Sequence, residues 1–134
     1  MSSLLIDTNV IVDLLKADPE WMPWSATQVA KARGTVPLVI NIVVYAELCS
    51  HQQTQSQIDG FLRDANIDIP AISKSAALAA SRAFLQHRQR GGGKTGVLPD
   101  FFIGAQAVTE GWTLLTRDAA RYKTYFPKIK LICP

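Results

Sequence analysis

Short apolar runs that alternate with helix-like segments are the feature that most limits how this sequence can fold. The apolar run 4–6 ends at Asp7, and apolar residues then recur at helical spacing over 10–15. A second run, 37–40, is followed by Asn41, a plausible helix cap, and by a helical segment that includes Glu47. Buried strands that alternate with helices predict an α/β domain with a mostly parallel central sheet and helices on both faces.

The same alternation continues to the end of the chain. Apolar spacing and stop signals predict further helices over 21–33, 58–65, 73–90 and 101–109, and further strands over 67–69, 112–116 and 130–133. In the alanine-rich helix over 73–90, we expect Ala77, Leu78, Phe84 and Leu85 to face inward. No repeat or linker interrupts the pattern, which therefore predicts a single domain over residues 1–134.

Composition narrows the protein class. The chain has 134 residues, of which 48% are hydrophobic and 19% are charged, as expected for one compact domain. The first residues lack a secretory pattern, and the longest apolar stretch, 36–46, is too short to span a membrane. Cys49 and Cys133 are too isolated to indicate a zinc knuckle or a disulfide framework. We therefore expect a cytoplasmic protein without a membrane segment.

Charge is distributed unevenly along the chain. The formal net charge is +3, but residues 1–70 hold 4 basic and 8 acidic residues, whereas residues 71–134 hold 10 basic and 3 acidic ones. This asymmetry permits a polyanionic partner, although a solvated basic face explains it equally well. The candidate contacts to such a partner, which is RNA if the resemblance described below holds, are Arg88, Arg90 and Lys94 around a glycine-rich segment, together with Arg117.

Several familiar motifs are excluded by their context. The segment 91–96 contains both GxGxxG and GKT, but it follows a predicted helix and lacks the first glycine of a Walker loop. His51 and His87 have no second histidine at ligand spacing, so an imidazole zinc site is unsupported. No GxSxG elbow is present.

Four carboxylates stand where a site would form. Asp7 and Asp118 follow predicted strands, Glu47 lies in an apolar helix, and Asp100 begins another helix. Taken singly, each aspartate is explained as a helix cap and Glu47 as a partly exposed helix residue. Taken together, they are expected at the carboxyl edge of the sheet, where all-oxygen ligands favour Mg²⁺ or Mn²⁺.

A metal held by carboxylates suits phosphodiester chemistry, because it binds phosphate oxygens and activates water. A metal-dependent nuclease is therefore the leading interpretation. Two alternatives remain. One is a receiver-type phosphoacceptor module, which is also α/β and binds magnesium but offers no role for Glu47 or Asp118. The other is a catalytically silent RNA-binding module.

Four segments resemble the motifs of PIN-domain ribonucleases, and in particular those of the VapC-type toxins of toxin–antitoxin pairs. They are residues 5–13 (LIDTNVIVD), 46–48 (AEL), 98–107 (LPDFFIGAQA) and 115–118 (LTRD). The resemblance implies that Asp7, Glu47, Asp100 and Asp118 hold one or two Mg²⁺ or Mn²⁺ ions. It also implies that Thr8 and Asn9 support the first carboxylate, and that Thr116 orients water or the last carboxylate.

The resemblance further implies a function. It predicts an endoribonuclease that leaves a 5′-phosphate and a 3′-hydroxyl, forms a homodimer and is held inactive by a small VapB-like antitoxin. Gly104 stands where alanine is commoner in the family, and Cys49 begins a pair of residues where glycine is often seen. Trp21, Met22 and Trp24 form a candidate antitoxin surface, although burial in the core explains at least one tryptophan as well.

Overall fold

A five-stranded parallel sheet forms the centre of the computed structural model, which describes residues 2–51, 53–92 and 98–134. All strand pairs are parallel, and the strand order is β3-β2-β1-β4-β5. The strands are β1 (Leu4–Ile6), β2 (Leu38–Val39), β3 (Ile67–Asp68), β4 (Thr113–Leu115) and β5 (Lys130–Ile132). The predicted sheet is confirmed, and β2 and β3 are shorter than the apolar runs that predicted them.

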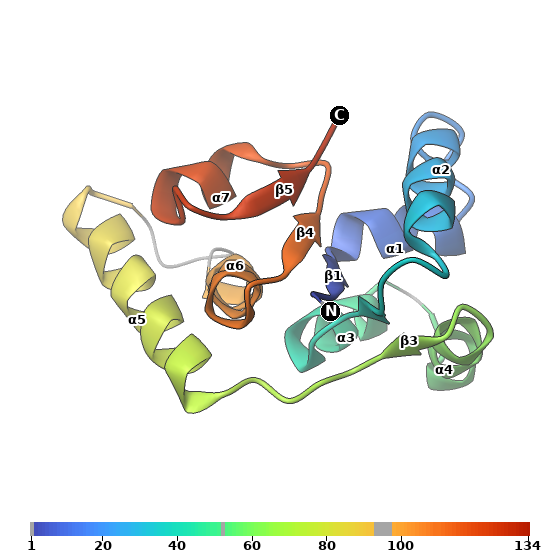
Figure 1. The fold of residues 1–134 in the computed structure, drawn as a ribbon, viewed down its shortest axis with the longest axis horizontal. Coiled ribbons are helices and arrows are strands. Elements are labelled where there is room, and N and C mark those ends of the chain that lie inside the picture. Colours follow the sequence, from blue (N-terminus) through green and yellow to red (C-terminus); the bar gives the residue numbers. More distant parts are fainter. Residues whose placement is uncertain (1, 52, 93–97) are drawn as a thin grey trace.

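Helices cover both faces of this sheet, as predicted. Figure 1 shows α1 and α2 on one side of the strands and α5, α6 and α7 on the other, while α3 contacts both α1 and α6. None of the described helices is long and apolar enough to cross a membrane. The helices are α1 (Thr8–Leu15), α2 (Met22–Ala32), α3 (Ile42–Cys49), α4 (Gln55–Asp64), α5 (Lys74–Gln89), α6 (Leu98–Glu110) and α7 (Ala120–Tyr125).

Local sequence signals explain where several helices begin. The Asn41 side chain accepts a hydrogen bond of 2.9 Å from the backbone N–H of Val44, which satisfies a free donor in the first turn of α3. Thr54 and Gln57 form a reciprocal capping box at the start of α4, and Ser73 caps α5. These caps agree with the helix starts expected near residues 41 and 73.

The strand order separates two of the sequence-based interpretations. Receiver-type proteins order their strands 2-1-3-4-5, with the third strand beside the first. Here β1 lies between β2 and β4 instead. The receiver-type interpretation is therefore wrong for this fold. From β1 the chain adds β2 and β3 on one side of the sheet and then crosses over to add β4 and β5 on the other side. Ligands of open parallel sheets bind at such a switch in strand order, outside the carboxyl ends of the strands.

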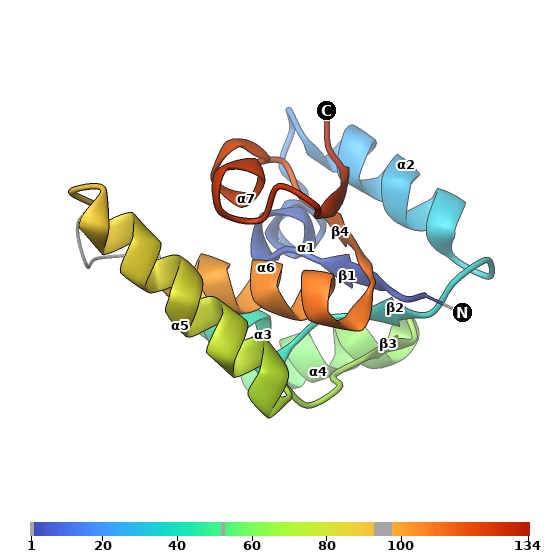
Figure 2. The ribbon, with the colours of Figure 1, turned by 60° about the vertical axis from the view of Figure 1, so that its left-hand side comes forward.

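Helix α5 packs on a different face from the one predicted. Leu78 and Leu85, expected to be inward, are 53% and 55% exposed. Ala77 and Phe84 are half-buried. The helix lies across α6 (Figure 2), and its fully buried positions are the small residues Ala76, Ala80 and Ala83. Small side chains let two helix backbones approach closely, so the alanine stripe rather than the leucines forms the contact.

Helix α7 is an element that the sequence reasoning missed. It has six residues, of which only Tyr122 is buried, and it packs against α6. The contact passes over Gly104, where an added Cβ would lie 2.6 Å from a ring carbon of Phe126. The glycine that departs from the family pattern thus makes room for the end of α7.

Helix α2 carries the proposed tryptophan surface. Trp24 is half-buried and packs against the hydrophobic core, as the core interpretation predicted for at least one tryptophan. Trp21 is also half-buried, and Met22 is 38% exposed. Only Ser25 is fully buried in this helix. Helix α2 therefore presents much of its surface to solvent.

Candidate active site

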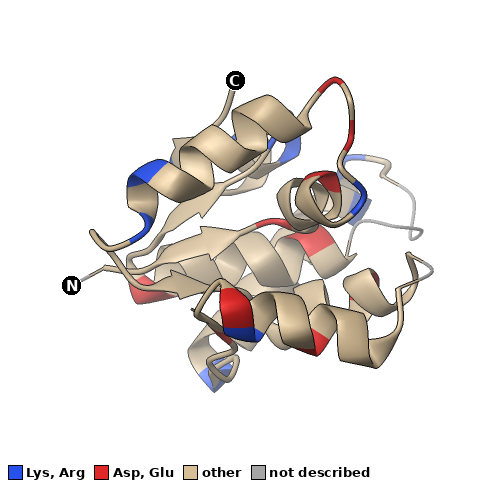
Figure 3. Ribbon diagram, turned by 90° about the vertical axis from the view of Figure 1, so that its right-hand side faces the viewer, with Lys and Arg blue, Asp and Glu red and all other residues tan. Residues whose placement is uncertain are grey.

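The four predicted carboxylates surround one pocket at the carboxyl ends of β1 and β4. The pocket has a volume of about 290 Å³ and is lined by Asp7, Glu47, Asp100 and Asp118. Figure 3 shows acidic positions gathered around the ends of the central strands that lie away from the N-terminus, with basic positions among them. The parallel sheet therefore brings together side chains that are separated by up to 111 positions in the sequence.

Asp7 is the most enclosed of these acids. It is only 5% exposed and caps α1 through a 2.7 Å hydrogen bond from the backbone N–H of Thr8 to Oδ1. Its Oδ2 accepts hydrogen bonds from the hydroxyls of Thr116 at 2.7 Å and Tyr122 at 2.9 Å. Burial raises the pKa of Asp7 to about 6, even though these donors oppose the shift. Asp7 is thus both a helix cap and a member of the site.

Glu47 projects from α3 and is held by α1. The hydroxyl of Thr8 donates a 2.6 Å hydrogen bond to Oε1 of Glu47, which is half-buried. Thr8 therefore serves two carboxylates, Asp7 through its backbone N–H and Glu47 through its side chain. The resemblance predicted only its support of the first carboxylate.

Asp100 lies within the first turn of α6 rather than at the cap position. Its Oδ2 accepts a charged hydrogen bond from Nη1 of Arg121, a residue of α7 that also lines the pocket. Burial raises the pKa of Asp100, and the neighbouring guanidinium opposes that shift. One of the four acids is therefore already paired with a cation supplied by the chain itself.

Thr116, directly after β4, links Asp7 to the loop that carries Asp118. Its hydroxyl donates to Asp7 and accepts a 3.0 Å hydrogen bond from the backbone N–H of Asp118. The side-chain amide of Asn9 donates to the same oxygen at 3.4 Å, so Asn9 reaches Asp7 only through Thr116. The Asp118 residue is exposed, and it does not cap α7 because Ala119 holds that position.

The donor chemistry of this pocket fits a hard divalent cation. All four acids offer oxygen, and three of them, Asp7, Asp100 and Glu47, lie close enough to raise the pKa of Tyr122 through their charges. Within the described part of the chain, no three His, Cys, Asp or Glu side chains already meet as a metal-binding group. The four carboxylates therefore line one pocket, but no three of them are close enough together to hold a metal ion as they stand. One of them, Asp100, is paired with Arg121.

Three features of the site escaped the sequence reasoning. Arg121 and Tyr122 come from the missed helix α7, and His51 lies at the pocket although it has no histidine partner in the sequence. A signal for α7 was present, because Tyr122, Tyr125 and Phe126 stand at helical spacing. No pattern in the sequence indicated that the side chains of this short helix would reach Asp7 and Asp100.

The candidate RNA contacts are dispersed. Arg88 and Arg90 are exposed at the end of α5, away from the pocket lining, and the guanidinium of Arg90 lies 5.4 Å from the ring centroid of Tyr125. Arg117 lines the pocket and forms an ion pair with Asp13. Lys94 and most of the glycine-rich segment lie outside the described residues.

Comparison with known proteins gives consistent results. The sequence model of the PIN domain family matches residues 4–127. The fold is similar to the solved structure of VapBC2 from Rickettsia felis bound to a promoter DNA fragment, with a TM-score of 0.77 and 20% identity over 98% of both chains. It is also similar to VapBC-1 from nontypeable Haemophilus influenzae, with a TM-score of 0.73 and 18% identity over 98% of this chain and 97% of that one.

A third similar structure is FitAcB from Neisseria gonorrhoeae, with a TM-score of 0.66 and 18% identity over 96% of each chain. A search of curated proteins found no match. At these identities the structural likeness describes the fold, whereas the family match covers nearly the whole sequence.

Proposed function

The chain belongs to the PIN domain family, and we propose that it is a metal-dependent endoribonuclease acting as the toxin of a toxin–antitoxin pair. The observation that carries the proposal is the pocket lined by four carboxylates. In it, buried Asp7 accepts hydrogen bonds from Thr116, directly after β4, and from Tyr122 of α7. The described similarity to VapBC complexes supports the toxin assignment.

The chain's own residues prepare the site. Thr116 and Tyr122 orient Asp7, and Thr8 holds Glu47. Asp7 is ionised above about pH 6, the form in which it can ligate a cation. When bound by the four acids, Mg²⁺ or Mn²⁺ would activate water and stabilise the charge that develops on a phosphodiester. The all-oxygen donor set is the observation that favours these ions over zinc.

RNA is the proposed substrate. The second half of the chain supplies most of its positive charge, and phosphate contacts made by such residues weaken with added salt. Arg88 and Arg90 at the end of α5 and Arg117 at the pocket are the proposed contacts, with Lys94 added from the sequence alone. An RNA substrate also accords with a cytoplasmic site of action.

We further propose that a small VapB-like antitoxin binds the chain and that the chain forms a homodimer. The support is the series of solved VapBC complexes to which the fold is similar. Co-expression with a short reading frame that neighbours the gene tests the first point, and light scattering of the purified chain tests the second.

The decisive experiment is an RNA cleavage assay with purified protein. We expect cleavage with Mg²⁺ or Mn²⁺, products that carry a 3′-hydroxyl, and no cleavage with a chelator. Asp7→Asn should abolish cleavage, whereas Asp64→Asn, an 83% exposed acid on α4, should not. Cleavage by Asp7→Asn at the wild-type rate would refute the site assignment. Binding of RNA without cleavage under every metal condition would favour the silent RNA-binding module.

A further inference from the structure

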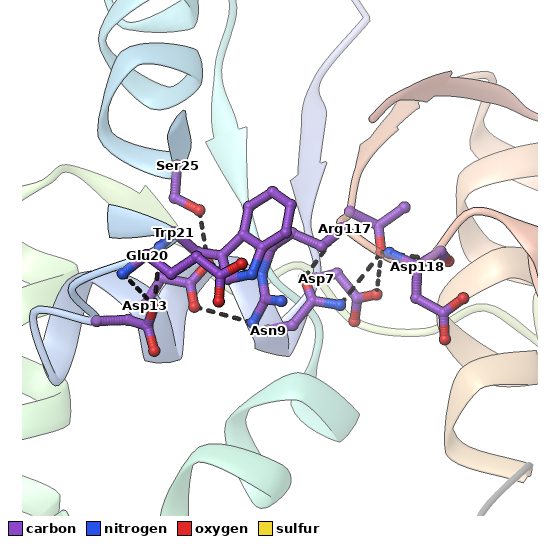
Figure 4. A network of polar contacts seen from close by, with 10 residues as sticks. Asp7, Asn9, Asp13, Glu20, Trp21, Ser25, Arg117 and Asp118 are labelled. Atoms are coloured by element: carbon purple, nitrogen blue, oxygen red, sulfur yellow. Dashed lines mark hydrogen bonds and ion pairs between the residues drawn. The ribbon is translucent and has the colours of Figure 1, made fainter. Parts of the chain in front are cut away.

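A buried carboxylate beside the pocket has no role in the proposed chemistry. Asp13, on α1, is 2% exposed and accepts hydrogen bonds from Nε and Nη2 of Arg117 at 2.8 and 3.0 Å. The hydroxyl of Ser25 donates to the same carboxylate at 2.7 Å. Figure 4 shows this network beside Asp7 and Asp118. The pairing is bidentate, the geometry that fixes a guanidinium most firmly.

Trp21 restrains the same guanidinium from its face. The Cζ atom of Arg117 lies 4.9 Å from the Trp21 ring centroid, within cation–π distance. The tryptophan is itself secured, because its backbone N–H donates a 2.8 Å hydrogen bond to the Asp18 carboxylate and its ring packs edge-on against Trp24. Arg117 is therefore held in its plane by Asp13 and on its face by Trp21.

Arg117 nevertheless remains open to a ligand. Its side chain is 27% exposed and lines the pocket, and within the described residues its Nη1 has no hydrogen-bond partner. Its backbone N–H donates to Oδ1 of Asn9 at 3.2 Å, which fixes the loop that carries Asp118. A rigid donor is thus presented next to the four carboxylates.

We propose that Asp13 and Trp21 are positioning residues that orient Arg117 to bind a phosphate of the RNA beside the acidic site. The proposal rests on the proposed function and deepens it. A free arginine loses much rotamer freedom when it binds, and fixing it in advance removes that loss from the binding step. Buried ion pairs add little to stability when compared with apolar replacements, so stability alone is a weak reason for Asp13.

Substitution of Asp13 tests this role, because a positioning effect and a simple charge effect change the Kd for RNA in opposite directions. Asp13→Asn removes a negative charge, so the charge change alone would tighten binding of a polyanion. Loss of the orienting partner predicts the opposite, an increase of about fivefold in the Kd for RNA. Glu20→Gln is the matched control, because it removes one negative charge from an exposed residue next to Trp21 whose side chain forms no hydrogen bond or ion pair with Arg117 among the described residues. This control should bind RNA as tightly as the wild type or more tightly.

The Kd is measured by fluorescence anisotropy with single-stranded RNA and a chelator, so that nothing is cut. Thermal unfolding shows which variants are folded. Arg117→Lys provides a second arm if Asp13→Asn does not fold, since lysine keeps the charge but cannot make the bidentate pair. We expect Arg117→Lys also to weaken binding by about fivefold.

Binding as tight as that of the wild type by folded Asp13→Asn, or by Arg117→Lys, would overturn the positioning role. If the wild type still cut RNA in that case, the proposed function would stand. If the wild type neither bound nor cut RNA, both proposals would fail together.

Discussion

The hydroxyl of Tyr122 donates a 2.9 Å hydrogen bond to Oδ2 of Asp7, so the helix after β4 secures the carboxylate that follows β1. Tyr122 is 2% exposed, and burial together with the nearby acids raises its pKa well above the ordinary value. The phenol therefore stays protonated across the physiological range and remains a hydrogen-bond donor. Asp7 depends on this donor because the carboxylate is buried away from solvent.

Tyr122→Phe should raise the pKa of Asp7 further above 6. The variant removes a hydrogen bond to the ionised carboxylate, and such a bond contributes on the order of 1 kcal/mol, or about one pKa unit. NMR titration of the Asp7 carboxyl carbon in metal-free protein measures the change.

Tyr45→Phe is the matched control for this substitution. It removes a 2.7 Å hydrogen bond of the same kind, from Tyr45 to the exposed Asp59. Asp7 should titrate as in the wild type in this control. An unchanged Asp7 titration in Tyr122→Phe itself would show that the bond has no influence on the carboxylate.

Asp7→Asn should stabilise the metal-free protein at neutral pH. The pKa of Asp7 is about 6 in the folded chain against an ordinary 3.8, so the folded state binds the proton more tightly. The stability that this group contributes is fully present below about pH 4 and is lost as the pH rises through 6. At pH 7 the variant should therefore exceed the wild type by up to about 3 kcal/mol in free energy of unfolding.

Urea unfolding at pH 4 and pH 7 with a chelator measures this difference. The advantage of Asp7→Asn should shrink to about 0.6 kcal/mol at pH 4, where the folded wild-type carboxyl is protonated and the unfolded one is only partly ionised. A difference of equal size at both pH values would mean that Asp7 ionisation does not destabilise the fold. Added Mg²⁺ should restore the wild type relative to the variant, since only the wild type keeps the charged ligand.

The approach of Asp7 and Asp118 was predictable because it follows from the sheet, whereas Glu47 and Asp100 lie on the helices α3 and α6. Parallel strands end on one edge, so a carboxylate after β1 and another after β4 must lie near each other. The hydrogen-bond partners of these acids were not predictable in the same way. Arg121 and Tyr122 reach the pocket only because the six-residue helix α7 packs over α6, and so short a helix gives a weak periodic signal.

The exposed leucines of α5 illustrate a second limit. Hydrophobic periodicity assigns the largest apolar side chains to the core, and by that rule Leu78 and Leu85 belonged inside. Helix α6 already fills this interface with the fully buried ring of Phe101, which contacts the ring of Phe84. A large residue on one helix is accommodated by small ones on the other, and that complementarity depends on a partner that the sequence does not identify.

Gly104→Ala should destabilise the protein although alanine favours helices by about 1 kcal/mol over glycine. The new Cβ would lie 2.6 Å from a Phe126 ring carbon and 3.0 Å from one of Tyr122, so α7 must shift. We expect a net loss of about 1–2 kcal/mol in thermal or urea unfolding, together with a higher Asp7 pKa as Tyr122 moves. Adding Phe126→Leu should recover part of the loss. A single Gly104→Ala variant as stable as the wild type would show that α7 has room to spare.

Arg121→Gln should strengthen Mg²⁺ binding, because the guanidinium of Arg121 and the metal compete for the same Asp100 carboxylate. Removing a neighbouring positive charge also lowers the repulsion felt by an incoming cation, and together these effects predict an affinity about threefold to tenfold higher at pH 8. Isothermal titration calorimetry without RNA measures this affinity directly and does not depend on cleavage. Lys123→Gln, which removes an equal charge from an exposed position on α7, is the control that separates competition at Asp100 from the general field. Equal gains in the two variants would mean that the Arg121–Asp100 pair has no specific effect on the metal. A gain confined to Arg121→Gln would mean that Arg121 holds the Asp100 carboxylate until a metal ion displaces it.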